Sequence, residues 1–188
     1  MANEALRWAV TQGGTGLTES QLQRRVIDAI HAEGLVFDHP PIVGFGPNAA
    51  NPHYEPVPGQ DLTLTPDQVI LLDLWGGSRL GTVFADQTWM GFSGRTVPAR
   101  VQEVWRVVRD ARDAAIAVVK RKAGKEPLYG YEGDAAARGV IEAAGYGEYF
   151  VHRTGHSIDR DLHGSGPHLD NYETRDDREI LPGAGLSV

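Results

Sequence analysis

One stretch constrains the fold of this chain more than any other, the sequence VILLDLW at residues 69–75. A short and almost continuous apolar run predicts a β-strand that is buried on both faces. Asp73 interrupts this run, and an isolated buried carboxylate is strongly destabilising. We therefore expect Asp73 to meet an arginine, a hydrogen-bond network or a metal ion, or else to take up a proton.

A second aspartate, Asp86, lies in the next predicted strand, Thr82–Met90. If the turn is centred near residues 79–80, an antiparallel hairpin places Asp73 directly opposite Asp86. Opposed Cβ atoms are about 5 Å apart, and like charges there are destabilising unless a cation lies between them. The pair therefore predicts a shared metal ion, while Gly76-Gly77 is a second turn signal that would give another register.

The window HRTGHSIDRDLHGSGPH at residues 152–168 contains His152, His156, His163 and His168. Histidine titrates near neutral pH and is the commonest protein ligand for transition metals. Taken singly, each of these side chains is more often solvated or hydrogen-bonded than bound to a metal. Together with the two aspartates, His156 would give an oxygen-rich site with one imidazole, which suits manganese, cobalt, iron or zinc better than calcium. The chain has no cysteine, so thiol ligands are excluded.

The remaining patterns predict an α+β fold. A capping box at Thr18-Glu19-Ser20-Gln21 begins a helix that Gly34 ends. A second helix follows Pro98 and runs to Ala123-Gly124, and a third runs from about Asp134 to Ala144. Further strands are predicted at Ile42–Phe45 and Tyr149–Val151. Helices that follow and interrupt strands without strict alternation favour α+β over a doubly wound sheet.

Length and charge limit the function. A chain of 188 residues predicts one domain with a substantial core. The net charge of −7 is spread without a basic stripe, which argues against nucleic acid or an anionic membrane as partner and favours small molecules or peptides. No apolar run is long enough for a membrane helix, and the first residues lack the layout of a signal peptide, so we expect a cytoplasmic protein.

Three motifs, in order along nearly the whole chain, carry a family resemblance: GPNAANPHY, then LLDLW followed by FADQTW, then HRTGHSI followed by DLHGSGP. Together they resemble the pita-bread metallopeptidases, in particular the Xaa-Pro aminopeptidase and prolidase branch. The resemblance implies a curved antiparallel sheet covered by helices. It also implies hydrolysis of the N-terminal residue of Xaa-Pro peptides by a metal-activated water.

The resemblance also assigns roles to residues. Asp73 and Asp86 would bridge or chelate two divalent ions and His156 would bind one of them, with manganese expected ahead of cobalt, zinc or iron. His53, His152 and His163 would line the catalytic pocket, where they help with proton transfer and peptide binding. The implied partner is a peptide with proline at its second position, and a homo-oligomer is left open.

The chain departs from the family pattern at both ends. Family members continue past a stretch like ILPGAGLSV into strands that carry two glutamate ligands, and they usually begin with a separate N-terminal domain. We therefore expect residues 1–188 to form a single catalytic-type domain that lacks both, with its sheet incomplete at the C-terminal end. The alternative is a catalytically inactive or truncated pita-bread domain that serves as a binding or structural module.

Overall fold

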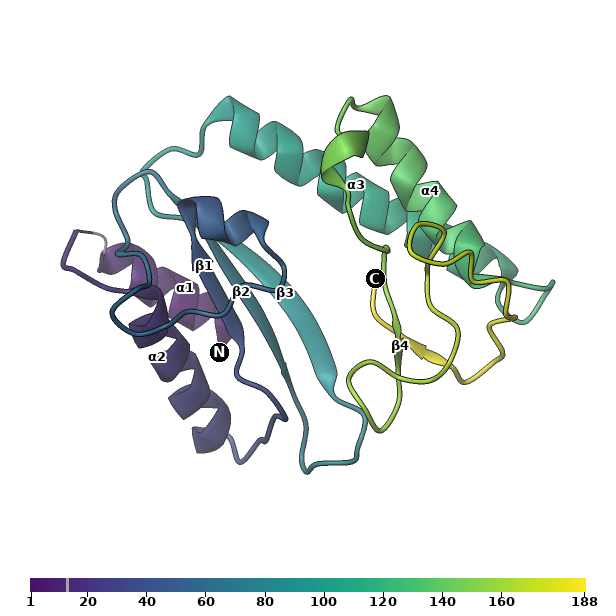
Figure 1. The fold of residues 1–188 in the computed structure, drawn as a ribbon, viewed down its shortest axis with the longest axis horizontal. Helices are drawn as coiled ribbons and strands as arrows, with labels where there is room; N and C mark the ends of the chain where they lie inside the picture. The colour runs from purple at the N-terminus through teal and green to yellow at the C-terminus, as the bar shows by residue number, and fades with distance from the viewer. Residues whose placement is uncertain (13) are drawn as a thin grey trace. The chain divides into compact units, whose positions relative to one another are not determined.

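The computed structural model describes residues 1–12 and 14–188. The chain forms two compact units, Met1–Val97 and Pro98–Val188, each of which combines helices with strands (Figure 1). The predicted α+β class is confirmed. The expectation of one catalytic domain over residues 1–188 stays a prediction. Within the described residues, no helix combines the length and the apolarity needed to span a lipid bilayer.

Two helices begin the first unit. Helix α2, Glu19–Ala32, starts at the predicted capping box: the Thr18 hydroxyl accepts from the Gln21 N–H, and the Gln21 side chain accepts from the Thr18 N–H at 3.0 Å. The chain reverses at Gly34, whose φ of 71° is a left-handed conformation that favours glycine. Helix α1, Ala2–Thr11, was not predicted, although it buries Ala2, Ala5, Leu6 and Ala9 along one face.

A three-stranded antiparallel sheet of order β1-β2-β3 forms the centre of the first unit, with α1 and α2 against one face (Figure 1). Its strands are β1, Ile42–Phe45, β2, Val69–Gly76, and β3, Ala85–Phe92. Alternate side chains of β2 point toward the helices. The buried core of this face comprises Leu6, Leu22, Val26, Ile30, Val43, Phe45, Ile70 and Leu72.

The register of the central hairpin differs from the prediction. Asp73 pairs with Thr88, and Asp86 pairs with Trp75. The turn is therefore centred one residue later than expected, next to Gly81, whose φ of 73° suits the tip of a turn. The prediction that Asp73 lies directly opposite Asp86 is wrong, because a one-residue move of the turn centre shifts the pairing by two positions.

The second unit contains a helical pair. Helices α3, Ala99–Lys122, and α4, Gly130–Ala143, pack through buried small side chains, chiefly Ala111, Ala115 and Ala137 with Ile141 (Figure 1). Small residues at such a contact let two helices approach closely. Both predicted helices are confirmed, although α4 begins four residues before the expected Asp134.

The rest of the second unit is mostly irregular. The 3-10 helix η2, Gly147–Tyr149, follows α4, and strands β4, Ser157–Ile158, and β5, Gly185–Leu186, form an antiparallel pair. The predicted strand at Tyr149–Val151 is wrong, because Tyr149 ends η2 and the next residues are irregular. The Phe150 carbonyl in this segment accepts from the Arg138 side chain of α4 instead of from a neighbouring strand. In the first unit, the 3-10 helix η1, Gly46–Ala50, follows β1 directly.

Candidate metal centre

Asp73 and Asp86 lie on the same face of the sheet, the face that points away from α1 and α2. Side chains alternate along a strand, so Asp73 points opposite to the core residues Leu72 and Leu74. Asp86 pairs with Trp75, which lies two residues from Asp73 and therefore on the same face. A shift of register by two positions keeps both carboxylates on the same face of the sheet. A shift by one position would have placed them on opposite faces.

The two carboxylates are diagonal neighbours on adjacent strands. Such pairs have a typical separation of about 7–8 Å, less between Cβ atoms, compared with about 5 Å for opposed pairs. Asp73 is half-buried rather than fully buried, so the prediction of a strand buried on both faces does not hold at this position. Its Oδ1 accepts a hydrogen bond from the Thr88 hydroxyl at 2.7 Å. Asp86 is half-buried as well.

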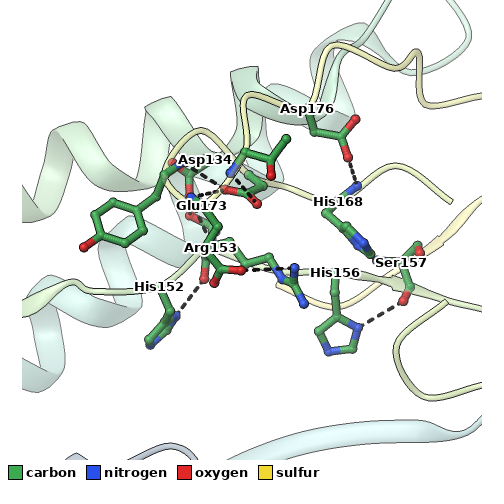
Figure 2. A network of polar contacts seen from close by, with 12 residues as sticks. Asp134, His152, Arg153, His156, Ser157, His168, Glu173 and Asp176 are labelled. Atoms are coloured by element: carbon green, nitrogen blue, oxygen red, sulfur yellow. Dashed lines mark hydrogen bonds and ion pairs between the residues drawn. The ribbon is translucent and has the colours of Figure 1, made fainter. Parts of the chain in front are cut away.

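His156 lies in the second unit, directly before β4. Its backbone N–H donates to the Ser187 hydroxyl at 3.1 Å, and its carbonyl accepts from the Ser187 N–H at 2.8 Å. The ring Nδ1 lies 3.0 Å from the Ser157 carbonyl oxygen, which can only accept (Figure 2). In the neutral ring Nδ1 therefore carries the proton and Nε2 carries the lone pair that a metal ion requires.

The other predicted histidines occupy different surroundings. His152 is half-buried, and its Nδ1 lies 2.7 Å from the Arg153 carbonyl oxygen, which leaves the lone pair of the neutral ring on Nε2. The His163 side chain is exposed, and its ring lies 4.4 Å from the His156 ring at a tilt of 59°. His53 is exposed on the loop after η1, in the first unit.

The donor set fits a divalent ion in its chemistry. Two carboxylates and an imidazole with its lone pair on Nε2 suit manganese, cobalt, iron or zinc. Within each unit the structure brings together only part of the predicted set, Asp73 with Asp86 in the first unit and His156 with His163 in the second. Over residues 1–12 and 14–188, no group of three or more histidine, aspartate or glutamate side chains is gathered closely enough to hold a metal ion.

A buried carboxylate that the sequence did not single out organises the loop that carries His53. Glu19, in the first turn of α2, is fully buried and accepts from the backbone N–H groups of Phe45 at 2.6 Å and Leu62 at 2.8 Å. Its second oxygen also accepts from the Tyr54 hydroxyl at 2.6 Å. Burial, together with this hydrogen bond and the nearby negative charge, raises the pKa of Tyr54 to about 12.

His168 has a structural environment. The ring Nδ1 accepts from the Ser157 backbone N–H at 3.0 Å, and the backbone N–H of His168 donates to Asp176 Oδ2 at 2.7 Å (Figure 2). Burial, with Arg153 and Arg178 nearby, lowers the pKa of the His168 ring. The ring therefore acts as a neutral acceptor that ties the start of β4 to the loop at residues 164–168.

A second buried carboxylate, Asp134 on α4, was also missed as a functional candidate. It binds the segment that carries His152 (Figure 2). In the sequence, Asp134 and Glu19 read as ordinary acidic residues near helix starts. Nothing local indicates that their partners lie about 20 or more positions further along the chain.

Comparison with known proteins supports the resemblance. The model of metallopeptidase family M24 matches residues 1–188. The chain is 37% identical over 125 residues to an Xaa-Pro dipeptidase of Lactobacillus helveticus, covering 65% of this chain and 30% of that protein. It is 30% identical over 173 residues to the probable dipeptidase PepE of Mycobacterium tuberculosis, covering 92% of this chain and 42% of that protein. The chain thus spans less than half the length of these curated relatives.

Solved structures of peptidases have the same fold. The structure resembles the prolidase from Pyrococcus furiosus with a TM-score of 0.78 at 23% identity, covering 98% of this chain and 51% of that one. It resembles the dipeptidase PepE from Mycobacterium ulcerans with a TM-score of 0.76 at 28% identity, covering 98% of this chain and 46% of that one. The predicted pita-bread fold is confirmed. The chain belongs to metallopeptidase family M24.

Proposed function

We propose that this chain provides metal-binding and pocket residues of a metal-dependent exopeptidase that removes the N-terminal residue of Xaa-Pro peptides. The observation that carries the proposal is the pair Asp73 and Asp86, half-buried on one face of the sheet in a chain of family M24. Relatives of this family include proteins named Xaa-Pro dipeptidase. That name supports a peptide with proline at its second position as the substrate.

Asp73, Asp86 and His156 are the residues that would hold the metal, for which we propose two divalent ions, with manganese ahead of cobalt, zinc and iron. Bound divalent ions supply a hydroxide at neutral pH and a Lewis acid for the scissile carbonyl. The carboxylates contribute negative charge that neutralises the ions. His156 contributes Nε2, whose lone pair is set by the contact of Nδ1 with the Ser157 carbonyl.

The remaining histidines would act on protons and on the peptide. In the neutral His152 ring, the Arg153 carbonyl fixes the proton on Nδ1, so Nε2 can accept a proton and return it to the leaving amine. His53 and His163 are exposed, and we assign them to binding of the peptide. Glu19 and Tyr54 would hold the loop that presents His53.

Hydrolysis of an Xaa-Pro dipeptide by the purified chain with added Mn²⁺ tests this proposal. We expect turnover that falls by more than about 100-fold in Asp86→Asn, because changes to outer-shell residues alone already cost 10–100-fold. Asp28→Asn makes the same charge change at an exposed position of α2 and should leave turnover unchanged. Equal rates for the unaltered chain and Asp86→Asn would contradict the proposal.

A second candidate is a pita-bread domain that binds or supports a partner without catalysis. The observation that favours it is the lack of any three-donor group of histidine, aspartate and glutamate side chains in the described part of the chain. This candidate predicts no Mn²⁺-dependent turnover and no loss of stability after chelation. A cytoplasmic location stays a prediction, and a homo-oligomer stays an open alternative.

A further inference from the structure

A buried carboxylate on α4 reaches the irregular segment that follows η2. Asp134 is fully buried, and its Oδ1 accepts from the Thr154 N–H at 2.9 Å and from the Thr154 hydroxyl at 2.7 Å. The Arg138 guanidinium, one helical turn along α4, donates to the same carboxylate from Nε at 2.9 Å and from Nη2 at 3.2 Å. All of these donors converge on one side chain, so Asp134 ties Thr154 to the helix.

Arg138 binds the same segment at two further points. Its Nη1 donates to the Phe150 carbonyl at 2.9 Å, and its Nη2 donates to the His152 carbonyl at 2.8 Å. The guanidinium carbon also lies 4.2 Å from the centre of the Phe150 ring. Three nitrogen atoms of the guanidinium make these four hydrogen bonds, whereas a lysine ammonium has three N–H donors on a single nitrogen atom and cannot replace them all.

The bound segment carries His152, which is half-buried, and leads directly into the half-buried His156. Its backbone is irregular, so its polar groups depend on partners outside a helix or sheet ladder. With the carbonyl of His152 and the N–H of Thr154 both fixed by α4, the backbone on either side of Arg153 has little freedom. The Arg153 carbonyl is the group that holds the His152 ring through Nδ1.

The same restraint continues to His156. Gly155 pairs with Leu169, and a Cβ at Gly155 would lie 2.1 Å from the Ser187 carbonyl oxygen. Only glycine therefore fits between Thr154 and His156. The chain enters His156 from a position that α4, Leu169 and Ser187 define together.

We propose that Asp134 and Arg138 form a positioning pair that sets the backbone of residues 150–155 and thereby aims the rings of His152 and His156. The inference rests on the proposed function only in treating these histidines as pocket and metal residues. The pair is a poor device for stability alone, because a buried ion pair replaced by apolar side chains of similar volume is often neutral or stabilising. The pair forms hydrogen bonds with the backbone of the segment that leads to the histidines, which indicates a role in positioning their side chains.

The test compares Asp134→Asn and Arg138→Lys with Lys122→Gln in the full chain. Lys122 forms an ion pair with Glu132 that joins α3 to α4, with the lysine side chain 12% exposed, and its ammonium donates to both carboxylate oxygens of Glu132. Lys122→Gln therefore controls for a general loss of stability in the same unit. Urea unfolding would establish that the variants compared are folded and similarly destabilised.

Two readouts need no metal. Nitrogen-15 correlation spectra of the imidazole rings report which nitrogen of His152 and of His156 carries the proton, and amide exchange reports the Thr154 N–H. We expect mixed tautomers and roughly tenfold faster Thr154 exchange in Asp134→Asn and Arg138→Lys, with both readouts unchanged in Lys122→Gln. Ring spectra and Thr154 exchange identical to those of Lys122→Gln would overturn the proposal. Should Asp134→Asn fail to fold, Arg138→Lys and Thr154→Val make the same comparison.

A third readout, Mn²⁺ titration, links the positioning pair to the site. We expect binding about 10–100-fold weaker in Arg138→Lys, as for changes in groups that orient a metal ligand, and a change of less than about twofold in Lys122→Gln. If the unaltered chain binds no Mn²⁺, the proposed function fails, while the ring and exchange data still decide the positioning role. Equal Mn²⁺ affinity in all variants would overturn the link to His156.

Discussion

Replacing Glu19 by glutamine tests how strongly one buried carboxylate organises the first unit. Its Oε1 accepts from the Phe45 N–H at 2.6 Å and from the Asn48 amide at 3.0 Å, while Oε2 accepts from Tyr54 and Leu62. A glutamine side chain has one oxygen and one NH₂ group. Whichever way the amide turns, the NH₂ faces either the Phe45 or the Leu62 backbone N–H, and that donor loses its acceptor.

The magnitude follows from these contacts. A buried N–H left without an acceptor costs about 1–3 kcal/mol, and the remaining hydrogen bonds weaken because they no longer end on a charged group. A neutral amide costs less to bury than a carboxylate, which offsets part of this loss. We expect the free energy of unfolding to fall by about 2 kcal/mol.

The assay is urea unfolding together with amide exchange of residues 42–64. Glu33→Gln, which makes the same charge change at the exposed C-terminal cap of α2, should stay within about 0.5 kcal/mol. The pKa of Tyr54 should also fall from about 12 in Glu19→Gln, since a hydrogen bond and a negative charge that raise it are removed. A loss of stability no larger than in Glu33→Gln would refute the reasoning.

The remaining predictions concern the second unit. Burial raises the pKa of Asp176, but hydrogen bonds from Arg178 and from backbone N–H groups outweigh it and lower the pKa to about 2. The contribution of Asp176 to stability is therefore present above about pH 4 and is lost as the pH falls toward 2, so Asp176→Asn should reduce the fall of the unfolding free energy over this pH range. Gly155→Ala should destabilise the unit by at least about 2 kcal/mol, because the new Cβ would meet the Ser187 carbonyl, as measured by urea unfolding. Ser157→Ala should raise the unfolding free energy by about 1 kcal/mol, since the buried Ser157 Oγ has no hydrogen-bond partner among the described residues.

Each of these changes has a matched control. Asp177→Asn removes a charge from the exposed neighbour of Asp176 and should leave the acid limb unchanged. Gly139→Ala adds a Cβ inside α4 that would meet no atom within 4 Å outside the neighbouring residues and the backbone of its own helix, so it should stabilise by about 0.5–1 kcal/mol. A Gly155→Ala variant as stable as Gly139→Ala, or a Ser157→Ala variant less stable than the unaltered chain, would contradict the contacts described above.

Local signals in the sequence predicted much of the fold. The hydroxyl of Thr18 and the amide of Gln21 determine where α2 begins, and both act on backbone groups within the same turn. The apolar run at residues 69–75 predicted β2 within one residue of its observed end. The prediction that Asp73 and Asp86 lie on one face of the sheet is correct, because side chains alternate along a strand and a shift of register by two positions does not change their face.

Features that depend on distant partners were missed. The register of the hairpin depends on where its turn is centred, and several residues from Gly76 to Gly81 could occupy that position. The β-branched and aromatic residues near Tyr149 suggested a strand, but Arg138 provides partners for that backbone instead. The burial of Glu19 and Asp134 depends on donors far along the chain, and no local pattern marks them.

The central proposal is that Asp73, Asp86 and His156 hold divalent metal. Anomalous diffraction at the manganese edge, from crystals of the chain grown with Mn²⁺, tests it most directly. We expect anomalous peaks within about 2.5 Å of carboxylate oxygens of Asp73 and Asp86, one of them also beside Nε2 of His156. Crystals that contain Mn²⁺ only at other residues, with these carboxylates and this imidazole pointing apart, would contradict it.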